Sequence, residues 1–396
     1  MKNSQVSTNK SIRRTKRPKI MFCTRKECEN HKYIELYNLD FTEKVDKSLI
    51  DNSWYKYSGT YFNETKKRFI TRFTCKSCGA SFSTQTFHVS YYKKKPMKPK
   101  KTLMKLSNST SQSNLAEITN NSEKAIANDV LRLGWQTLGA NNLLRKYFKI
   151  TSPIVIDGLE NKIRSKQCPH DLNIAVDSAS QCIISIDNSY FRAKGRQTEK
   201  QKERQKIYDR TLYYEKHSTR NSTRRLIKGV YPLGLKSNIL YSDEKKEYRH
   251  AITMLGKDGY KLQHETVSSK LNRNFKNPLY PVNYIDREIR KDLETYKRKT
   301  VYIAKDMSNS MVRACIYSFY HNNIKIFRKK NKNSGFHYTE AGIDNNVVKR
   351  MLSKIFSKRI IYSVLELTPF EKLVWNGQVP NPFGDRKYPL PAYALQ

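Results

Sequence analysis

The chain has 396 residues and a formal net charge of +41, because 76 lysines and arginines outnumber 35 aspartates and glutamates. Such an excess would repel itself in a free globule, so a polyanion, DNA or RNA, is the expected partner. An anionic membrane surface is the rival, but we find no apolar run of about 18 residues and no evident amphipathic anchor. The composition therefore predicts a nucleic-acid-binding protein of two or three domains with no membrane association.

Residues 1–20 end in the basic run RRTKRPK and have no hydrophobic periodicity, which predicts a disordered basic arm. Two cysteine pairs follow, Cys23-x4-Cys28 and Cys75-x2-Cys78. Zinc takes four thiolates in a tetrahedron, and two short loops supply two sulfurs each. We therefore predict a zinc ribbon over residues 21–92 with a large insertion between its halves.

Two features of this segment bear on that prediction. Gly79 directly follows Cys78 and lets the loop turn tightly around the thiolates, whereas His31 is expected to be a bystander. The alternatives are unrelated thiols or redox pairs. Structural disulfides are disfavoured inside cells, and no secretory signal precedes the cysteines.

Residues 93–124 are rich in Lys, Pro, Ser and Asn and predict a linker. Residues 125–168 show apolar residues at helical spacing in three stretches, the first stopping near Gly139 and the last beginning at Ser152-Pro153 and including Ile156. This layout predicts a helix-turn-helix that places Lys162, Arg164 and Lys166 near the DNA backbone. Any small three-helix bundle would give the same pattern.

Residues 169–325 predict an α/β domain. Two apolar runs, 172–178 and 182–187, form a hairpin with Asp177 on its first strand, and the run NILYSD ends in a further strand at Asp243. Helices are expected near 247–255 and 309–322. The basic insertion 192–228 would cover a DNA groove or form a solvated helix, and residues 326–396 are a basic C-terminal extension.

Asp177 and Asp243 each end an apolar strand, where an aspartate is costly unless it is paired or bound to a cation. Mg²⁺ or Mn²⁺ held by two such carboxylates would serve phosphodiester chemistry. The alternative is that each aspartate caps the turn or helix that follows its strand.

The segment from His264 to Thr300 resembles the signature region of bacterial insertion-sequence transposases of the zinc-ribbon, Asp-Asp-Glu type. The matching residues are His264, Thr266, Val267, Asn283, Arg287, Arg290, Leu293, Arg298, Lys299 and Thr300. The sequences IAVDSASQ and LYSDEKKEYR resemble the regions of the first two catalytic aspartates, at Asp177 and Asp243. The four cysteines match the N-terminal ribbon, and YPLPAYA resembles the C-terminus.

This resemblance implies an RNase H-like catalytic domain, a mixed sheet with flanking helices. It also implies binding to the element's terminal inverted repeats and metal-dependent DNA strand cleavage and transfer. The last carboxylate of that pattern, a glutamate, is missing where it is expected, because Met311, Val312 and Arg313 stand there. Asp306 is the nearest acid, and its place before a helix suits an N-cap better.

We therefore expect a transposase that binds double-stranded DNA, both element ends and target, as a homodimer in the cytoplasm at the nucleoid. Structural Zn²⁺ and catalytic Mg²⁺ or Mn²⁺ would be its cofactors, and Arg287, Arg290 and Arg298 would clamp phosphates. The alternative is an impaired or domesticated transposase that acts as a DNA-binding regulator or architectural protein. RNA binding with a preference for single strands is a third possibility.

Overall fold

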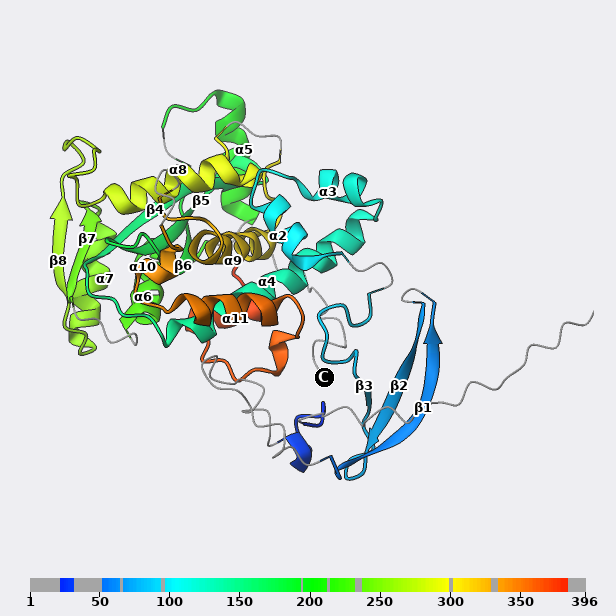
Figure 1. Cartoon of the computed structure of the whole chain (residues 1–396). Helices are drawn as coiled ribbons and strands as arrows, with labels where there is room; N and C mark the ends of the chain where they lie inside the picture. The colour runs from blue at the N-terminus through cyan, green and yellow to red at the C-terminus, as the bar shows by residue number, and fades with distance from the viewer. Residues whose placement is uncertain are drawn as a thin grey trace, which may run out of the picture. The chain divides into compact units, whose positions relative to one another are not determined.

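The computed structural model describes residues 22–31, 52–64, 67–93, 97–193, 195–211, 214–231, 237–298, 302–328 and 334–383 (Figure 1). The arm predicted for residues 1–20 and the YPLPAYA ending lie outside these ranges. The chain divides after Tyr91 into two compact units. No helix among the described residues is long and apolar enough to cross a membrane.

The first unit is built on a three-stranded antiparallel sheet of β1 (Tyr55–Asn63), β2 (Arg68–Cys75) and β3 (Ser81–Ser83). Its core consists of aromatic rings beside the cysteines, with Trp54 stacked on Phe82 at a centroid distance of 5.3 Å. Because such a small core buries little apolar area, a unit of this size usually needs a metal or disulfide staple.

The second unit contains a five-stranded mixed sheet in the order β6-β5-β4-β7-β8. Its strands are β4 (Ile154–Ile163), β5 (Ser165–Asp177), β6 (Ile183–Tyr190), β7 (Ile239–Asp243) and β8 (Gln263–Val267). The first three form an antiparallel meander, whereas β7 pairs in parallel with both β4 and β8. The predicted β5–β6 hairpin and the strand ending at Asp243 are thus confirmed.

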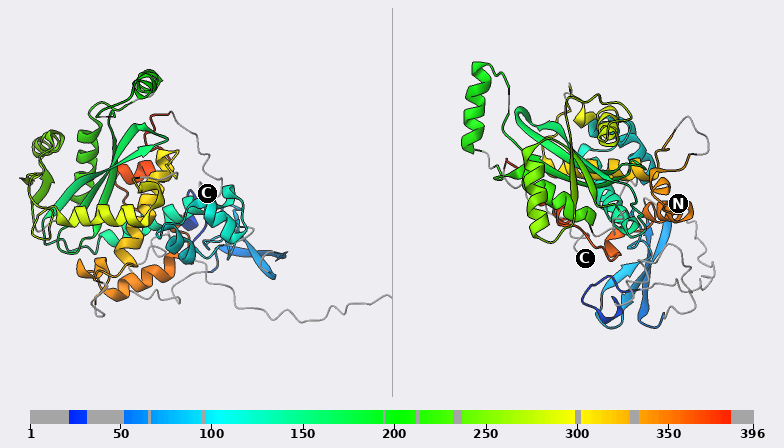
Figure 2. Two further views of the ribbon diagram at one scale, coloured as in Figure 1. Left: turned by 90° about the horizontal axis from the view of Figure 1, so that it is seen from above. Right: turned by 90° about the vertical axis from the view of Figure 1, so that its left-hand side faces the viewer.

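Helices cover both faces of this sheet (Figure 2). On one face α6 (Ser218–Val230) contacts β5, where Ser222 Oγ accepts a hydrogen bond of 2.6 Å from Asn173 Nδ2. On the other face lies α8 (Tyr280–Asp292), followed by Tyr296, whose ring packs edge-on against His170. Because His170 and Asn173 are three residues apart on one strand, they face opposite sides of the sheet.

Two further long helices were expected. α7 (Lys246–Lys257) matches the predicted helix near 247–255, and α9 (Met307–Asn323) matches the one near 309–322. Within the predicted insertion 192–228, α5 (Glu199–Thr211) is a solvated helix, but α6 buries Leu226 and Ile227 and belongs to the core.

The predicted linker 93–124 contains two helices, α2 (Pro99–Leu106) and α3 (Gln112–Thr119). Ser111 and Ser122 cap the N-termini of α3 and of the next helix, α4 (Glu123–Arg145), each side chain accepting a hydrogen bond from a backbone amide three residues later. Apolar residues that had no obvious partners in the sequence, such as Leu103 and Leu115, are buried here. The prediction of an unstructured linker is wrong for these residues.

The helix-turn-helix predicted over residues 125–168 is also wrong. α4 (Glu123–Arg145) runs without a break through Gly139, which the sequence suggested as a stop. Gly139 is required by close packing, because a Cβ there would lie 2.6 Å from Cγ1 of Ile360. The predicted third helix is strand β4, because the run Ile154-Val155-Ile156 is β-branched and is buried within the sheet. The α/β sheet therefore begins at residue 154, before the predicted boundary at 169.

The predicted C-terminal extension forms part of the core of the second unit. It contributes α10 (His337–Glu340), α11 (Asn345–Ile355) and α12 (Pro369–Trp375). The side chain of Gln136 on α4 joins this region to α4 by hydrogen bonds to the backbone of Ile355, Lys358 and Ile360, at 2.7, 2.6 and 2.6 Å.

Candidate active site and metal centre

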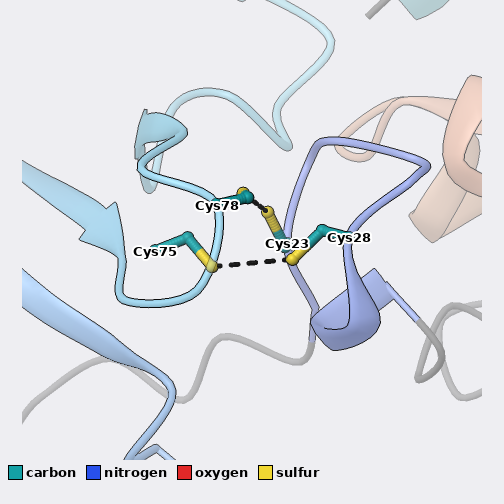
Figure 3. A group of neighbouring side chains, drawn as sticks. All are labelled: Cys23, Cys28, Cys75 and Cys78. Atoms are coloured by element: carbon teal, nitrogen blue, oxygen red, sulfur yellow. Dashed lines mark hydrogen bonds between the residues drawn. The ribbon is translucent and has the colours of Figure 1, made fainter.

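The four cysteines of the first unit converge on one point (Figure 3). Their sulfur atoms all lie within 4.8 Å of one another, with Cys23 to Cys78 at 3.5 Å and Cys28 to Cys75 at 3.7 Å. A tetrahedron with metal–sulfur bonds of about 2.3 Å has edges of about 3.8 Å. This buried group could hold a structural metal such as zinc.

Backbone and side-chain donors surround these sulfurs. The amide and side chain of Asn30 point at Cys28 Sγ from 3.4 and 3.8 Å, and Gly79, at a positive φ of 70°, closes the second loop. Burial raises the pKa of Cys23 and Cys28. At Cys75 the backbone amides of Cys78 and Ser77 outweigh burial and lower the pKa to about 7. His31 Nδ1 lies 2.6 Å from the carbonyl oxygen of Cys23, so the predicted bystander role fits its position.

A second group of acidic residues lies in the α/β unit. β4 pairs with β7 only through Ile154 and Val155, opposite Leu240 and Tyr241. Continuing this parallel register by two residues places Asp157 level with Asp243, on neighbouring strands and on the same face of the sheet. β7 ends at Asp243, and at the far end of β4 Ile163 forms an isolated parallel bridge with Ala304.

Helix α8, on one face of the sheet, contacts β4 and β5 and supplies a third carboxylate, Asp286. One of its oxygens, Oδ1, is buried and has no hydrogen-bond partner, and the same is true of the side-chain nitrogen of Asn283, one turn earlier. An acceptor and a donor left unpaired beside one another are unusual in a folded core. Their presence suits a site that receives a cation and a polar substrate.

The electrostatics agree with this grouping. Burial and the neighbouring Asp243 raise the pKa of Asp157 to about 6, although the Gly158 amide, 2.7 Å from its Oδ1, opposes the shift. Burial and Asp157 likewise raise the pKa of Asp286 well above its ordinary range. Carboxylates that repel one another in this way are stabilised by a divalent cation.

Lys245, two residues after Asp243, places a positive charge near Asp157 and lowers the pKa of that carboxyl. Its Nζ lies 3.1 Å from Oδ2 of Asp171, a buried residue on β5. Burial alone would lower the pKa of Lys245, but Asp171, Asp243 and Asp157 raise it. Gly158 makes room for this pair, since a Cβ there would come within 3.0 Å of Cγ of Asp171.

A cavity of about 970 Å³ opens between the distal half of β4 and α8. Its acidic lining residues are Asp157, Glu160 and Asp286, and its basic ones are Lys162, Lys166, Arg273, Arg287, Arg290 and Arg298. Five of the six residues predicted to bind DNA therefore meet in one place, although the sequence had assigned them to two different domains. Arg164 is the exception: its Nε donates to the carbonyl of Lys305 at 2.8 Å, and its guanidinium covers Phe383.

Other predicted site residues lie elsewhere. Asp177 pairs in register with Ile154 and accepts hydrogen bonds from the hydroxyls of Ser152 and Ser180, so it caps the turn after β5 and does not meet Asp243. Asp306 caps α9 by accepting from the Asn309 amide at 3.0 Å. Met311 and Val312 are buried in the core, where a carboxylate could not reach the cavity.

The sequence reasoning missed Asp157 and Asp286 for identifiable reasons. Asp157 lies in a stretch whose apolar spacing predicts a helix, although the β-branched run Ile154-Val155-Ile156 just before it favours a strand. Asp286 stands three residues after Asn283 and four before Arg290, so all three share one stripe of α8. Asn283 and Arg290 are among the residues that match the transposase signature. The helical stripe that they share with Asp286 was therefore the signal available in the sequence.

Comparisons with known proteins add little to this geometry. No family model and no curated protein matches the chain. Among solved structures, it is similar to a chain in the cryo-EM structure of the simian T-cell lymphotropic virus intasome in complex with PP2A regulatory subunit B56 gamma. The identity is 14%, the TM-score is 0.26, and the match covers 59% of this chain and 75% of that one. A TM-score this low does not establish a common fold.

Proposed function

We propose that the protein is a DNA transposase of an insertion sequence that cleaves and transfers DNA strands with an RNase H-like catalytic domain. The observation that carries the proposal is the placement of Asp157 beside both Asp243, on the neighbouring strand, and Asp286 on α8, with Asp157 and Asp286 lining a cationic cavity. The order of the sheet, an antiparallel meander followed by two parallel strands, supports the proposed fold.

The three aspartates would hold Mg²⁺ or Mn²⁺, because hard divalent cations prefer carboxylate oxygens together with substrate phosphate and water. When bound, such ions activate the attacking oxygen and stabilise the leaving one in phosphodiester chemistry. Among the described residues, only the cysteine group brings three or more possible ligand atoms within 4.8 Å of one another. The ligand atoms of the three aspartates are therefore not all within 4.8 Å of one another.

The basic residues of the cavity would bind and orient the DNA backbone. Six basic side chains against three acidic ones give its lining a net positive charge of three, which suits a polyanion. Arg290 also shapes the site, because its guanidinium donates to the carbonyls of Tyr296 and Glu160 at 3.2 and 2.9 Å and so joins α8 to β4. Arg287 and Arg298 are exposed and remain available for phosphates.

We propose that recognition of the element ends belongs to α2, α3 and α4, upstream of the predicted position. α3 and α4 are separated by three residues, Asn120 to Ser122, and Asn120 takes the left-handed conformation at a φ of 47°. This is the short turn that a helix-turn-helix requires. The first turns of α4 expose Lys124 and Asn128, which would face the bases of the major groove.

A cleavage assay on supercoiled DNA carrying the element ends tests the catalytic proposal. Asp157→Asn, Asp243→Asn and Asp286→Asn should each reduce Mn²⁺-dependent nicking by at least about a thousandfold, because each removes a charge that holds the metal. Binding to the same DNA should be retained. Asp177→Asn is the matched control, and it should keep most of the activity, since that carboxylate only caps a turn.

The opposite result would favour the regulator that the sequence left as an alternative. If the unmodified protein binds the ends tightly but never nicks them with Mg²⁺ or Mn²⁺, the acidic group is not a catalytic site. If Asp177→Asn abolishes nicking while Asp286→Asn does not, the residue assignment is wrong although the activity stands.

A further inference from the structure

The hairpin of β1 and β2 in the first unit extends beyond the sheet that anchors it. β3 pairs with Arg72, Phe73 and Thr74, so within the described residues the distal part of the hairpin, Thr60 to Asn63 paired with Arg68 to Thr71, is a ribbon of two strands (Figure 1). An isolated two-stranded ribbon is marginal in water. Apart from Ile70, none of the described side chains of this ribbon is buried, so the ribbon is a candidate contact surface.

Large aromatic side chains are exposed along this ribbon. Phe62 and Phe69 are directly opposite each other in register, with ring centroids 5.1 Å apart, and they are 42% and 72% exposed. Nearer the base, Tyr57 is 59% exposed. Aromatic side chains that could have been buried in the core, as Phe73 and Phe82 are, instead face solvent, and such apolar exposure marks interaction sites.

The opposite face of the ribbon is cationic. Arg68 and Arg72 alternate with Phe69 along β2, so they point away from the phenylalanine pair, and both are exposed. The Arg72 guanidinium lies 5.8 Å from the centroid of the Tyr61 ring. Between Tyr55 and Cys75 the sequence has five basic residues, Lys56, Lys66, Lys67, Arg68 and Arg72, and one acidic residue, Glu64.

We infer that this hairpin is a DNA-binding arm whose Phe62–Phe69 pair stacks on unpaired bases, while Arg68 and Arg72 bind the backbone of the same strand. The charge of the arm selects a polyanion as its occupant. The phenyl rings select exposed bases, because an intact duplex offers no free base faces, whereas a single strand offers one at every nucleotide. An apolar protein surface would match the phenyl rings but not the cationic face.

This inference adds a second contact to the proposed function and rests on that function only for the choice of DNA as the polyanion. Strand cleavage and transfer produce strand ends, so an arm that holds unpaired bases would act at that stage. The arm lies in a different unit from the aspartates, and the two can be tested separately.

The test uses the full-length, zinc-loaded protein with both phenylalanines changed to a β-branched residue that keeps the strands, Phe62→Thr with Phe69→Thr. Fluorescence anisotropy would measure binding to an oligothymidylate of about 12 nucleotides and to a blunt duplex of about 20 base pairs. We expect binding to the single strand to weaken about tenfold or more, since each stacked base contributes substantially. Binding to the duplex should change less than about twofold, because α4 and the cavity remain.

Two matched variants separate stacking from charge. Thr60→Ser with Thr71→Ser alters the neighbouring cross-strand pair on the same hairpin, and it should bind both probes normally. Arg68→Gln with Arg72→Gln should lower the slope of log K against log salt by about 1.4 on the single strand, a change that the phenylalanine variant should not show.

The inference is overturned if the phenylalanine variant, with its zinc content intact, binds both probes as tightly as the unmodified protein or loses affinity for both equally. It is also overturned if sedimentation shows that the variant has lost self-association, because the patch would then be an interface between copies of the chain. Failure of the proposed function has a different signature. In that case Asp157→Asn would leave DNA processing unaltered, and single-strand binding by the arm would be unaffected.

Discussion

The cysteine group and the aspartate group are both candidate metal sites, but they are built in opposite ways. The four cysteines come from two short loops, and their sulfurs already lie at the spacing of a zinc tetrahedron. The three aspartates come from β4, β7 and α8, one from each, between residues 157 and 286. The first site is recognisable from local spacing in the sequence, whereas the second exists only once the sheet and α8 have formed.

The two sites also differ in what they contribute to the fold. The thiols lie in the small aromatic core of their unit, so a metal there would supply folding energy. The aspartates repel one another beside a cavity, so at neutral pH they oppose the fold of a unit whose stability comes from a large core. We therefore expect a metal in the cysteine group to stabilise the first unit, whereas the aspartate group lowers the stability of the second. Three changes test this contrast, beginning with the largest expected effect.

Removing one cysteine should unfold the first unit. Cys75→Ser or Cys78→Ser takes away a ligand, and structural zinc contributes about 10 kcal/mol or more in small domains. We expect zinc content to fall from about one per chain to near zero, and amide exchange to become fast in β1, β2 and β3 while the second unit stays protected. Cys168→Ser, a buried thiol outside the group, should leave zinc unchanged.

If the cysteine variants keep slow amide exchange in β1, β2 and β3 without zinc, the cysteine group does not stabilise the first unit, and the contrast between the two sites is wrong. The aromatic core around Trp54 and Phe82 would then suffice, and the thiols would be ordinary core residues.

A second change tests the site that the sequence alone would have chosen for the third carboxylate. Val312→Glu should destabilise the second unit by about 4 kcal/mol and should not raise cleavage, because it buries an unpaired charge. Val312 is 2% exposed, and it packs so closely on α4 that a Cβ at Gly134 would lie 2.4 Å from its Cγ1. Asn309→Glu, in the first turn of α9, is the control and should be close to neutral, since an acid suits a helix N-terminus. Chemical denaturation measures both.

If Val312→Glu folds normally and cleaves DNA faster than the unmodified protein, the carboxylate belongs on α9 and Asp286 is not the third ligand.

Local patterns carried the sequence predictions that succeeded. The cysteine spacing, the β5–β6 hairpin, the strand that ends at Asp243 and the helices that follow it each depend on residues close together in the chain. The predictions that failed needed information from distant residues. Ile156, Leu159 and Ile163 have helical spacing, but pairing with β5 makes them a strand. Gly139 resembles a helix stop until Ile360, far along the chain, explains it.

Asp177 shows the same limit at the candidate site. Its place at the end of an apolar strand is the same as that of Asp243, and a catalytic ligand and a turn cap cannot be told apart from that position alone. The difference is that Ser152 and Ser180 donate hydrogen bonds to Asp177, whereas Asp243 lies level with a second carboxylate, Asp157. Only the register of β4 against β7 decides between them.

The smallest expected effect is a gain of stability when the charge of Asp157 is removed from the proposed catalytic site. The pKa of Asp157 is about 6 in the folded protein, above the value of about 3.9 for an unfolded chain, so folding is disfavoured once the carboxyl is ionised. The penalty is absent below about pH 4 and complete above about pH 6. Because water partly screens a side chain at a cavity wall, we expect Asp157→Asn to stabilise the second unit by about 1 to 2 kcal/mol at pH 8 without divalent cations. At pH 4 the gain should vanish.

Adding Mn²⁺ should raise the melting temperature of the unmodified protein and of Asp177→Asn, but not that of Asp157→Asn, because a ligand stabilises only the state that binds it. Differential scanning calorimetry with and without Mn²⁺ measures all of these. If Asp157→Asn is instead destabilising at pH 8 and Mn²⁺ leaves every melting temperature unchanged, Asp157 is a satisfied structural residue, and the two sites do not differ in the way proposed.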